Sequence, residues 1–127
     1  MLRNTLTAAL FALFLIPAAA HAEYSSVITD LPLMPTMKED PTKIVAFDTP
    51  DGRILETTAE TTAQLKQVLG YYGQTLPSLG WKLIKGTYNV YNREKEILTI
   101  EVFQKPGAKG VYLVQFKIAP APKGALQ

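Results

Sequence analysis

"YYGQTLPSLGW" (residues 71–81) decides where the helical part of this chain ends and where the strands after it begin. Pro77 has no N–H to donate to the carbonyl of Gly73, and its ring collides with that carbonyl. We therefore expect either a kinked helix or a helix that ends near Thr75 and is followed by one separate turn. Gly80 then supplies a left-handed terminator, and Trp81 begins the next strand beside the helix end. The stretch is predicted to have a structural role.

An amphipathic helix is predicted immediately before this stretch. Residues 61–64, Thr-Thr-Ala-Gln, fit a capping box, in which the threonine oxygen accepts from a first-turn N–H and the glutamine reaches back. Apolar residues then recur at steps of three and four, which is typical of one buried helix stripe: Leu65, Val68, Leu69, Tyr72, Leu76 and Leu79.

A β-hairpin is predicted upstream of the helix, between residues 43–49 and 53–58. Its turn is Pro50-Asp51-Gly52, where proline pre-sets the turn and glycine tolerates positive φ. A three-residue loop pairs Thr49 with Arg53. It also pairs Phe47 with Leu55 and Val45 with Thr57. In that register Val45, Phe47 and Leu55 form the core face, and Ala46, Asp48, Ile54 and Glu56 lie on the other face.

Three strands are predicted downstream of the helix. They are residues 81–92 with a bend at Gly86, residues 96–103 and residues 110–118. The preferred pairing sets Asn92 opposite Glu96, which aligns Val90 with Leu98 and Tyr88 with Ile100 and makes Lys95 the positive-φ residue of the turn. A competing register pairs Tyr91 with Leu98 and Asn89 with Ile100. The last strand is expected to face the core through Tyr112, Val114, Phe116 and Ile118.

The predicted fold is therefore α+β, a single domain of order β-β-α-β-β-β. One amphipathic helix packs on one face of an antiparallel sheet, because every strand-to-strand connection is short enough to be a hairpin. The domain is expected to cover residues 43–119. Residues 23–42 precede it as an extended, proline-containing segment, and residues 120–127 follow it as a mobile tail.

The first 22 residues are expected to be a secretory signal peptide. They combine a short positive start, an almost wholly apolar run from Leu6 to Ile16 and an Ala-x-Ala cleavage site. We expect cleavage after Ala22 and a periplasmic location, with an uncleaved anchor as the alternative. The apolar run is shorter than the roughly 20 residues of a spanning helix, so no stable membrane span is expected.

Composition after cleavage argues against most catalytic and nucleic-acid-binding classes. Without Arg3 the chain has 12 basic and 11 acidic residues, which provides no electrostatic case for nucleic acid. The only histidine is His21, and there is no cysteine. Nucleophilic triads and ordinary zinc or copper sites need those side chains, so we expect a non-enzymatic protein with no cofactor and no metal.

Paired carboxylates are the remaining catalytic possibility. In the predicted hairpin, Asp48 and Glu56 lie on the same outer face of neighbouring strands, and paired acids can hydrolyse glycosides. A sheet surface offers neither a cleft nor a raised pKa, so we favour a solvated polar face over a hydrolase.

Two apolar features are candidate partner-binding surfaces. The extended segment contains Leu31, Leu33, Met34 and Met37, which either cover part of the core or dock on a partner. The sheet face away from the helix is predicted to expose Tyr91, Phe103, Val111 and Leu113, together with Thr99. It is either covered by the extended segment or open to a lipid, a peptide or a protein, which could add a strand at an edge.

These features favour an exported protein-interaction or support module of the cell envelope. The alternative is a small carrier that holds an apolar ligand or lipid between helix and sheet. Such a carrier needs a cavity lined by Phe47, Leu65, Leu69, Tyr72 and Phe116, side chains that would more often fill one another's space.

Three motifs carry a family resemblance. "FDTPDGRI" (residues 47–54), "DLPLMP" (residues 30–35) and "YYGQTLPSLGW" resemble a family of small exported bacterial proteins without an established function. These motifs are turns and chain ends, and they imply no catalytic role. The order of amphipathic helix, Leu-Gly-aromatic and strand is also similar to the helix-over-sheet domains of outer-membrane assembly lipoproteins, a likeness of architecture alone.

Overall fold

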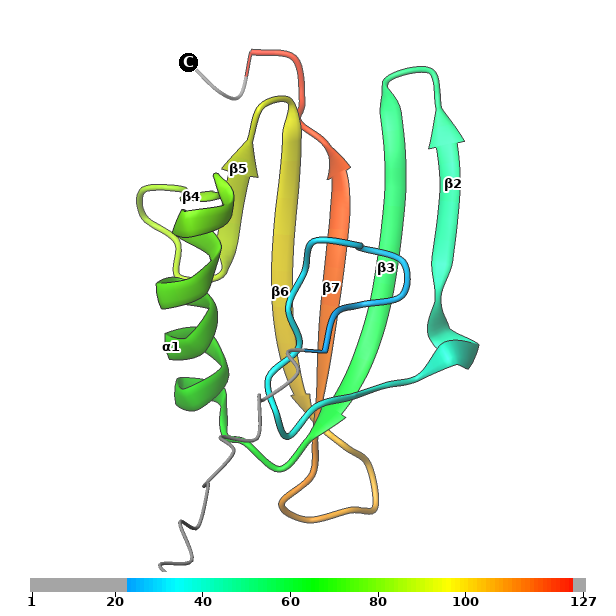
Figure 1. Cartoon of the computed structure of the whole chain (residues 1–127), viewed down its shortest axis with the longest axis vertical. Helices are drawn as coiled ribbons and strands as arrows, with labels where there is room; N and C mark the ends of the chain where they lie inside the picture. The colour runs from blue at the N-terminus through cyan, green and yellow to red at the C-terminus, as the bar shows by residue number, and fades with distance from the viewer. Residues whose placement is uncertain (1–22, 125–127) are drawn as a thin grey trace, which may run out of the picture.

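Seven strands form one antiparallel sheet in the computed structural model, which describes residues 23–124 (Figure 1). The strands are β1 (Lys38–Glu39), β2 (Val45–Thr49), β3 (Gly52–Thr61), β4 (Lys82–Leu83), β5 (Val90–Arg93), β6 (Glu96–Gln104) and β7 (Tyr112–Pro120). They run in the order β1-β3-β7-β6-β5-β4, and β2 pairs with the first half of β3 on the edge that β1 also uses. The predicted α+β class, with one helix packed against an antiparallel sheet, is confirmed.

The helix ends as its proline requires. Helix α1 (Leu65–Thr75) stops two residues before Pro77, and a separate 3₁₀ turn, η2 (Leu76–Leu79), follows it. Gly80 closes the turn with a left-handed φ of 89°, and Trp81 is buried beside the helix end. The second of the two predicted outcomes is therefore the correct one.

The predicted start of the helix was three residues too early. Gln64, not Thr61, is the N-cap residue, and its N–H donates to Gln67 Oε1 at 2.9 Å. Thr61 is instead the last residue of β3, where its hydroxyl accepts from Ala63 N–H. Leu65 is consequently 46% exposed, although the periodicity had placed it in the buried stripe.

The core lies between α1 and one face of the sheet, which we call the inner face. Val68, Tyr72 and Leu76 are buried on the helix side, and the Tyr72 ring meets Phe116 of β7 edge to face, with centroids 5.1 Å apart. Inward residues of β6 and β7 complete it: Leu98, Ile100, Val114, Phe116 and Ile118.

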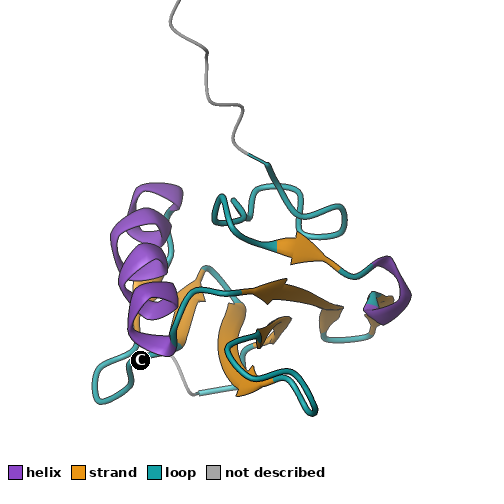
Figure 2. Ribbon diagram, turned by 90° about the horizontal axis from the view of Figure 1, so that it is seen from below, coloured by secondary structure: helices purple, strands orange, loops and turns teal. Residues whose placement is uncertain are grey.

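The N-terminal segment, residues 23–37, covers a further part of the inner face. It crosses in front of β6, β7 and β3 in Figure 1, and Figure 2 shows its loops above one side of the sheet. Tyr72 donates its hydroxyl hydrogen to the carbonyl of Pro32 at 2.8 Å. The predicted boundary at residue 43 is thus wrong: the segment belongs to the domain, and β1 and the 3₁₀ turn η1 (Pro41–Lys43) continue it into β2.

Carboxylates fasten this segment to the sheet. Glu39 of β1 accepts hydrogen bonds from Ser25 Oγ at 2.6 Å, from Ser26 N–H at 2.9 Å and from Thr57 Oγ1 at 2.7 Å. Partial burial alone would raise the pKa of Glu39, but these hydrogen bonds outweigh it and hold the pKa below its ordinary value of 4.5.

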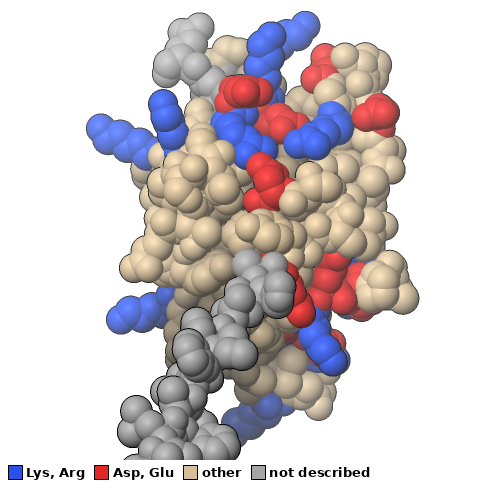
Figure 3. All heavy atoms as spheres, in the orientation of Figure 1, with Lys and Arg blue, Asp and Glu red and all other residues tan. Residues whose placement is uncertain are grey.

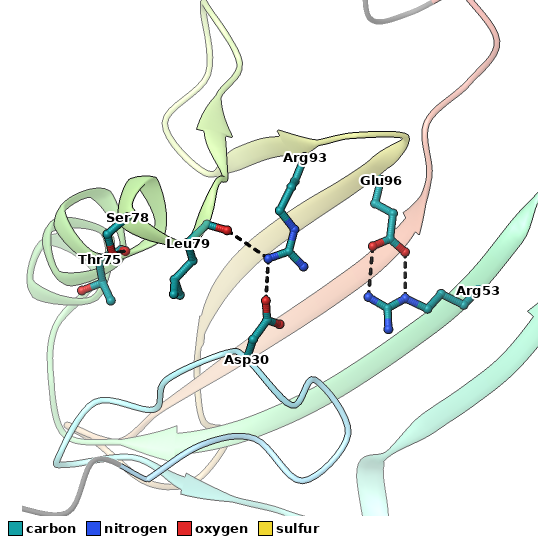
Figure 4. A network of polar contacts seen from close by, with 7 residues as sticks. All are labelled: Asp30, Arg53, Thr75, Ser78, Leu79, Arg93 and Glu96. Carbon is teal, nitrogen blue, oxygen red and sulfur yellow. Dashed lines mark hydrogen bonds and ion pairs between the residues drawn. The ribbon is translucent and has the colours of Figure 1, made fainter.

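A second fastening holds the middle of the segment, at Asp30 (Figure 4). Arg93 of β5 donates to Asp30 and to the carbonyl of Leu79, and its guanidinium stacks 4.1 Å from the centre of the Trp81 ring. Beside it, Arg53 of β3 makes a two-point ion pair with Glu96 of β6, and these hydrogen bonds raise the pKa of Arg53.

The first hairpin differs from its prediction by one residue. Thr49 pairs with Gly52, so the loop contains only Pro50 and Asp51, and Phe47 faces Ile54 rather than Leu55. Gly52 is the first residue of β3, with φ of 142°, and its carbonyl accepts the Thr49 hydroxyl hydrogen at 2.7 Å. This one-residue change turns Val45 and Phe47 away from the core and leaves Leu55 facing inward.

The second hairpin uses the register that the sequence analysis ranked lower. Arg93 pairs with Glu96 and Tyr91 with Leu98, and Glu94, not Lys95, has the positive φ of 55°. In this register Tyr91 faces the core, where it is 2% exposed and its hydroxyl lies beside Gly73 of α1. The predicted long strand over residues 81–92 is instead the pair β4 and β5, which fold back on each other across the turn at Gly86.

The expected tail begins later than residue 120. Pro120 is still part of β7, and Ala121 N–H donates to the carbonyl of Lys95 at 2.8 Å. The predicted signal peptide, with its cleavage site after Ala22, lies outside the described residues. Within residues 23–124 no helix has both the length and the apolar character needed to cross a bilayer.

Candidate functional site

Strand β2 is an edge strand that the core leaves exposed over residues 45–48. In Figure 1 it lies at the margin opposite α1, beyond the region that the N-terminal segment crosses. Phe47 is 54% exposed and Val45 is 38% exposed, although both are residues that proteins usually bury. Burial of the exposed part of each side chain would contribute roughly a third to a half of the about 1.5–3 kcal/mol of a full burial, so the strand has apolar surface available to a partner.

The backbone of β2 also presents free hydrogen-bonding groups. A two-residue turn is closed by a pair that exchanges both backbone hydrogen bonds, so Thr49–Gly52, Phe47–Ile54 and Val45–Glu56 are the bonded pairs of this hairpin. The N–H and C=O groups of Ala46 and Asp48 therefore point away from β3. None of these four groups has a hydrogen-bond partner among residues 23–124.

An apolar row leads from β2 across the outer face of the sheet, the face opposite α1. Phe47 pairs with Ile54, which neighbours Ala119, and Ala119 pairs with Ile97. The adjacent row is polar, because Glu56 and Lys117 form an ion pair at 3.2 Å. An apolar strip bordered by charges is the arrangement found at many protein interfaces. We call Val45, Phe47, Ile54, Ile97 and Ala119 the β2 surface.

A second apolar spot lies at the other end of the outer face. Phe103 is 49% exposed and pairs with Leu113, which is partly buried, as is Val111 just before β7. These residues point away from the helix, as predicted. The spot is interrupted by the ion pair between Glu60 and Lys105, because Glu60 is the β3 neighbour of Leu113. The ion pair therefore borders this apolar spot with charge.

The other predicted binding residues are in the core. Leu31, Leu33 and Met37 are each at most 5% exposed, and Met34 packs against the same cluster. Tyr91, expected on the outer face, is 2% exposed on the inner one, where burial raises the pKa of its hydroxyl. Within residues 23–124 the N-terminal segment lies on the helix side of the sheet and not on the outer face. Leu31, Leu33, Met37 and Tyr91 are therefore not available to a partner, and Met34 is partly buried.

The carboxylate pair of the hydrolase hypothesis does not form. Asp48 pairs with Arg53 and Glu56 pairs with Val45, so the two acids lie on opposite faces of the hairpin. Residues 23–124 contain neither histidine nor cysteine, and their acidic side chains form no group of three or more that could hold a metal ion.

The residues predicted to line a ligand cavity, on the carrier hypothesis, do not form one. Phe47 is 54% exposed and Leu65 is 46% exposed, so neither side chain encloses a cavity together with the buried pair Tyr72 and Phe116. The rings of that pair are in direct contact, so they fill the space that an apolar ligand would need.

Charge does not mark a binding face on the side that Figure 3 shows. Acidic and basic side chains are interspersed there, and no single-sign patch is formed. This distribution agrees with the small formal net charge of +2 for the whole chain. It provides no focused field of the kind that steers charged ligands.

No family model, curated protein or solved structure matches this chain. The likeness to small exported bacterial proteins therefore stays a prediction.

Sequence reasoning missed the β2 surface because it assigned Val45 and Phe47 to the core. The signal that could have found it is the length of the turn. A loop of Pro50 and Asp51 alone puts the apolar residues of β2 on the same side as Ile54.

Proposed function

We propose that this chain is a non-enzymatic, exported protein of the cell envelope that binds another protein by adding a strand to β2. The single observation that carries the proposal is the combination, on one edge strand, of unpaired backbone groups at Ala46 and Asp48 with the exposed ring of Phe47. Main-chain hydrogen bonds provide affinity in this binding mode, and alternate side chains provide specificity.

The magnitudes indicate how much surface the partner has to cover. Four backbone hydrogen bonds contribute about 0.5–1.5 kcal/mol each. Burial of the remaining exposed part of Phe47, which is 54% exposed, adds roughly half of the about 1.5–3 kcal/mol of a full burial. Association costs roughly 4–15 kcal/mol in lost freedom. Edge pairing alone barely offsets that cost, so the partner is expected also to cover the apolar row at Ile54, Ala119 and Ile97.

Edge strands of β-sheets that are not used for binding are usually protected against pairing with another chain. Natural sheets place lysine, proline, a bulge or a covering loop on an edge strand. Strand β2, from Val45 to Thr49, has no lysine, proline or bulge, and its only charged residue is Asp48. This lack of protection supports a role for the edge in binding.

Site-specific photocrosslinking in cells tests the proposal. Phe47 is replaced by p-benzoylphenylalanine, and the matched control carries the same probe at Tyr88, which is 67% exposed in the turn between β4 and β5. The expected result is a discrete protein adduct from position 47 that position 88 does not give. Equal adducts from both positions, or none from position 47, would contradict the proposal.

A further inference from the structure

We infer that the strand that pairs with β2 is β2 of a second copy of this chain, antiparallel to the first and centred on Phe47. This inference rests on the proposed function and names the partner of the same edge. It is carried by the self-complementarity of the strand in hydrogen bonding, in side-chain pairing and in charge.

The hydrogen-bonding groups match when Phe47 faces its own copy. In that register Ala46 lies opposite Asp48 of the second copy, and both residues point their N–H and C=O groups outward. The two Ala46–Asp48 pairs therefore exchange four backbone hydrogen bonds. Any register shifted by one residue would set an outward residue against one whose groups already bond to β3, so such shifts are excluded.

The side chains match in the same register. The central pair of phenylalanines is a non-hydrogen-bonded pair, where Cα atoms are about 4.5 Å apart and side chains are closest. Aromatic pairs at such positions are among the more stabilising cross-strand contacts. Val45 faces Thr49 of the second copy, and the apolar row of one copy continues through the two phenylalanines into the row of the other.

Charges favour this register over the other two symmetric ones. Lys43 lies at the end of the strand where the second copy presents Asp51, and neither residue makes an ion pair elsewhere among residues 23–124. Centring the pair on Asp48 would set two carboxylates face to face. Centring it on Ala46 would set Asp48 against Ile44. Only the register centred on Phe47 avoids both costs.

The interface between the two copies is small, so the dimer is expected to be weak and reversible. Strand β2 has five residues, and a stable interface usually buries at least about 1,000 Å². We therefore expect an association that depends on protein concentration. The small net charge of the chain provides little repulsion between copies.

The absence of cysteine allows a direct test. A Phe47→Cys variant places two thiols in the central pair, where the Cα separation of about 4.5 Å lies within the range for a disulfide. The matched control is Val45→Cys. It has the same edge and face, but its two copies lie about four residues apart along the strands, or about 13 Å. Under mild oxidation we expect a covalent dimer from Phe47→Cys in at least about tenfold excess over Val45→Cys.

Sedimentation velocity of the unmodified protein is the second measurement, because Phe47→Cys also removes the aromatic pair. We expect the sedimentation coefficient to rise with concentration, and Ala46→Pro, which removes an outward N–H, to abolish the rise. Equal disulfide yields from the two cysteine variants, or a sedimentation coefficient independent of concentration, would overturn the self-pairing. If self-pairing fails but the photocrosslinking probe at position 47 gives a position-specific adduct with a different protein, the proposed function stands. If self-pairing fails and position 47 gives no adduct, both the self-pairing and the proposed function are refuted.

Discussion

Glu39→Gln is the substitution that tests most closely how the N-terminal segment is held on the sheet. The carboxylate accepts from Ser25, Ser26 and Thr57, and both Ser25 and Thr57 donate to the same oxygen. In glutamine one oxygen becomes an NH₂ group. If the remaining oxygen keeps the fixed Ser26 N–H, the two buried hydroxyls must turn to accept from the amide.

Ser25 is poorly placed to make that turn. Its oxygen already accepts from Ile28 N–H at 3.1 Å, so its proton is directed to Glu39. Hydrogen bonds to charged groups contribute about 1.5–3 kcal/mol each, and about one of them is lost. We therefore expect Glu39→Gln to lower the free energy of unfolding by about 1–3 kcal/mol at pH 7.

The lowered pKa of Glu39 determines how its contribution to the free energy of unfolding changes with pH. The pKa of Glu39 is lower in the folded protein than its ordinary value of 4.5, so its contribution is fully present above pH 4.5 and is lost as the pH falls through the folded pKa. Urea denaturation at pH 7 and at successively lower pH is the assay. The difference between wild type and Glu39→Gln should shrink below pH 4.5, because the wild-type side chain then also becomes neutral.

Glu101→Gln is the matched control. Glu101 is exposed on the outer face and has no hydrogen-bond partner among residues 23–124, so its substitution should change the free energy of unfolding by less than about 0.5 kcal/mol. A difference for Glu39→Gln that is zero at pH 7, or that is the same at pH 7 and at pH 3, would refute the reasoning.

Four further substitutions have effects that thermal or chemical denaturation measures. Gly80→Ala should destabilise the fold by about 1–2 kcal/mol, because φ is 89° and the new Cβ would lie 3.3 Å from Arg93 Cδ; Gly70→Ala, in open space on α1, should instead stabilise it by up to about 1 kcal/mol. Trp81→Ala should cost about 3–5 kcal/mol, since the ring is 2% exposed; a loss below 1 kcal/mol would contradict its place in the core. Ala46→Pro should leave the free energy of unfolding within about 1 kcal/mol of wild type, because the lost N–H faces outward; a larger loss would mean that this N–H bonds within the fold.

Where local chemistry allows a residue only one conformation or one face, its place in the fold was predictable from the sequence. Pro77 cannot continue a helix and Gly80 tolerates a left-handed φ, so the helix end followed from local chemistry. The inward positions of β7 followed from strict alternation, and Val114, Phe116 and Ile118 are fully buried.

Residues whose face depends on a turn were not predictable in the same way. Loops of two and three residues are both compatible with Pro50-Asp51-Gly52, yet they put Phe47 on opposite faces. The face of Tyr91 depended likewise on the turn, in which Glu94 and not Lys95 has the positive φ. The candidate site was not predicted from the sequence because it depends on such a register. The burial of Leu31 was left open because it depends on contacts between residues far apart in the sequence.

The central claim is that β2 binds by pairing its backbone with another strand. It is tested most directly by the yield of the photocrosslinked adduct from position 47 in the presence and absence of Ala46→Pro. The account predicts that the proline abolishes the adduct, because the probe is unchanged and only an outward N–H at the edge is removed. An undiminished adduct in the folded Ala46→Pro protein would show that binding does not use the strand edge.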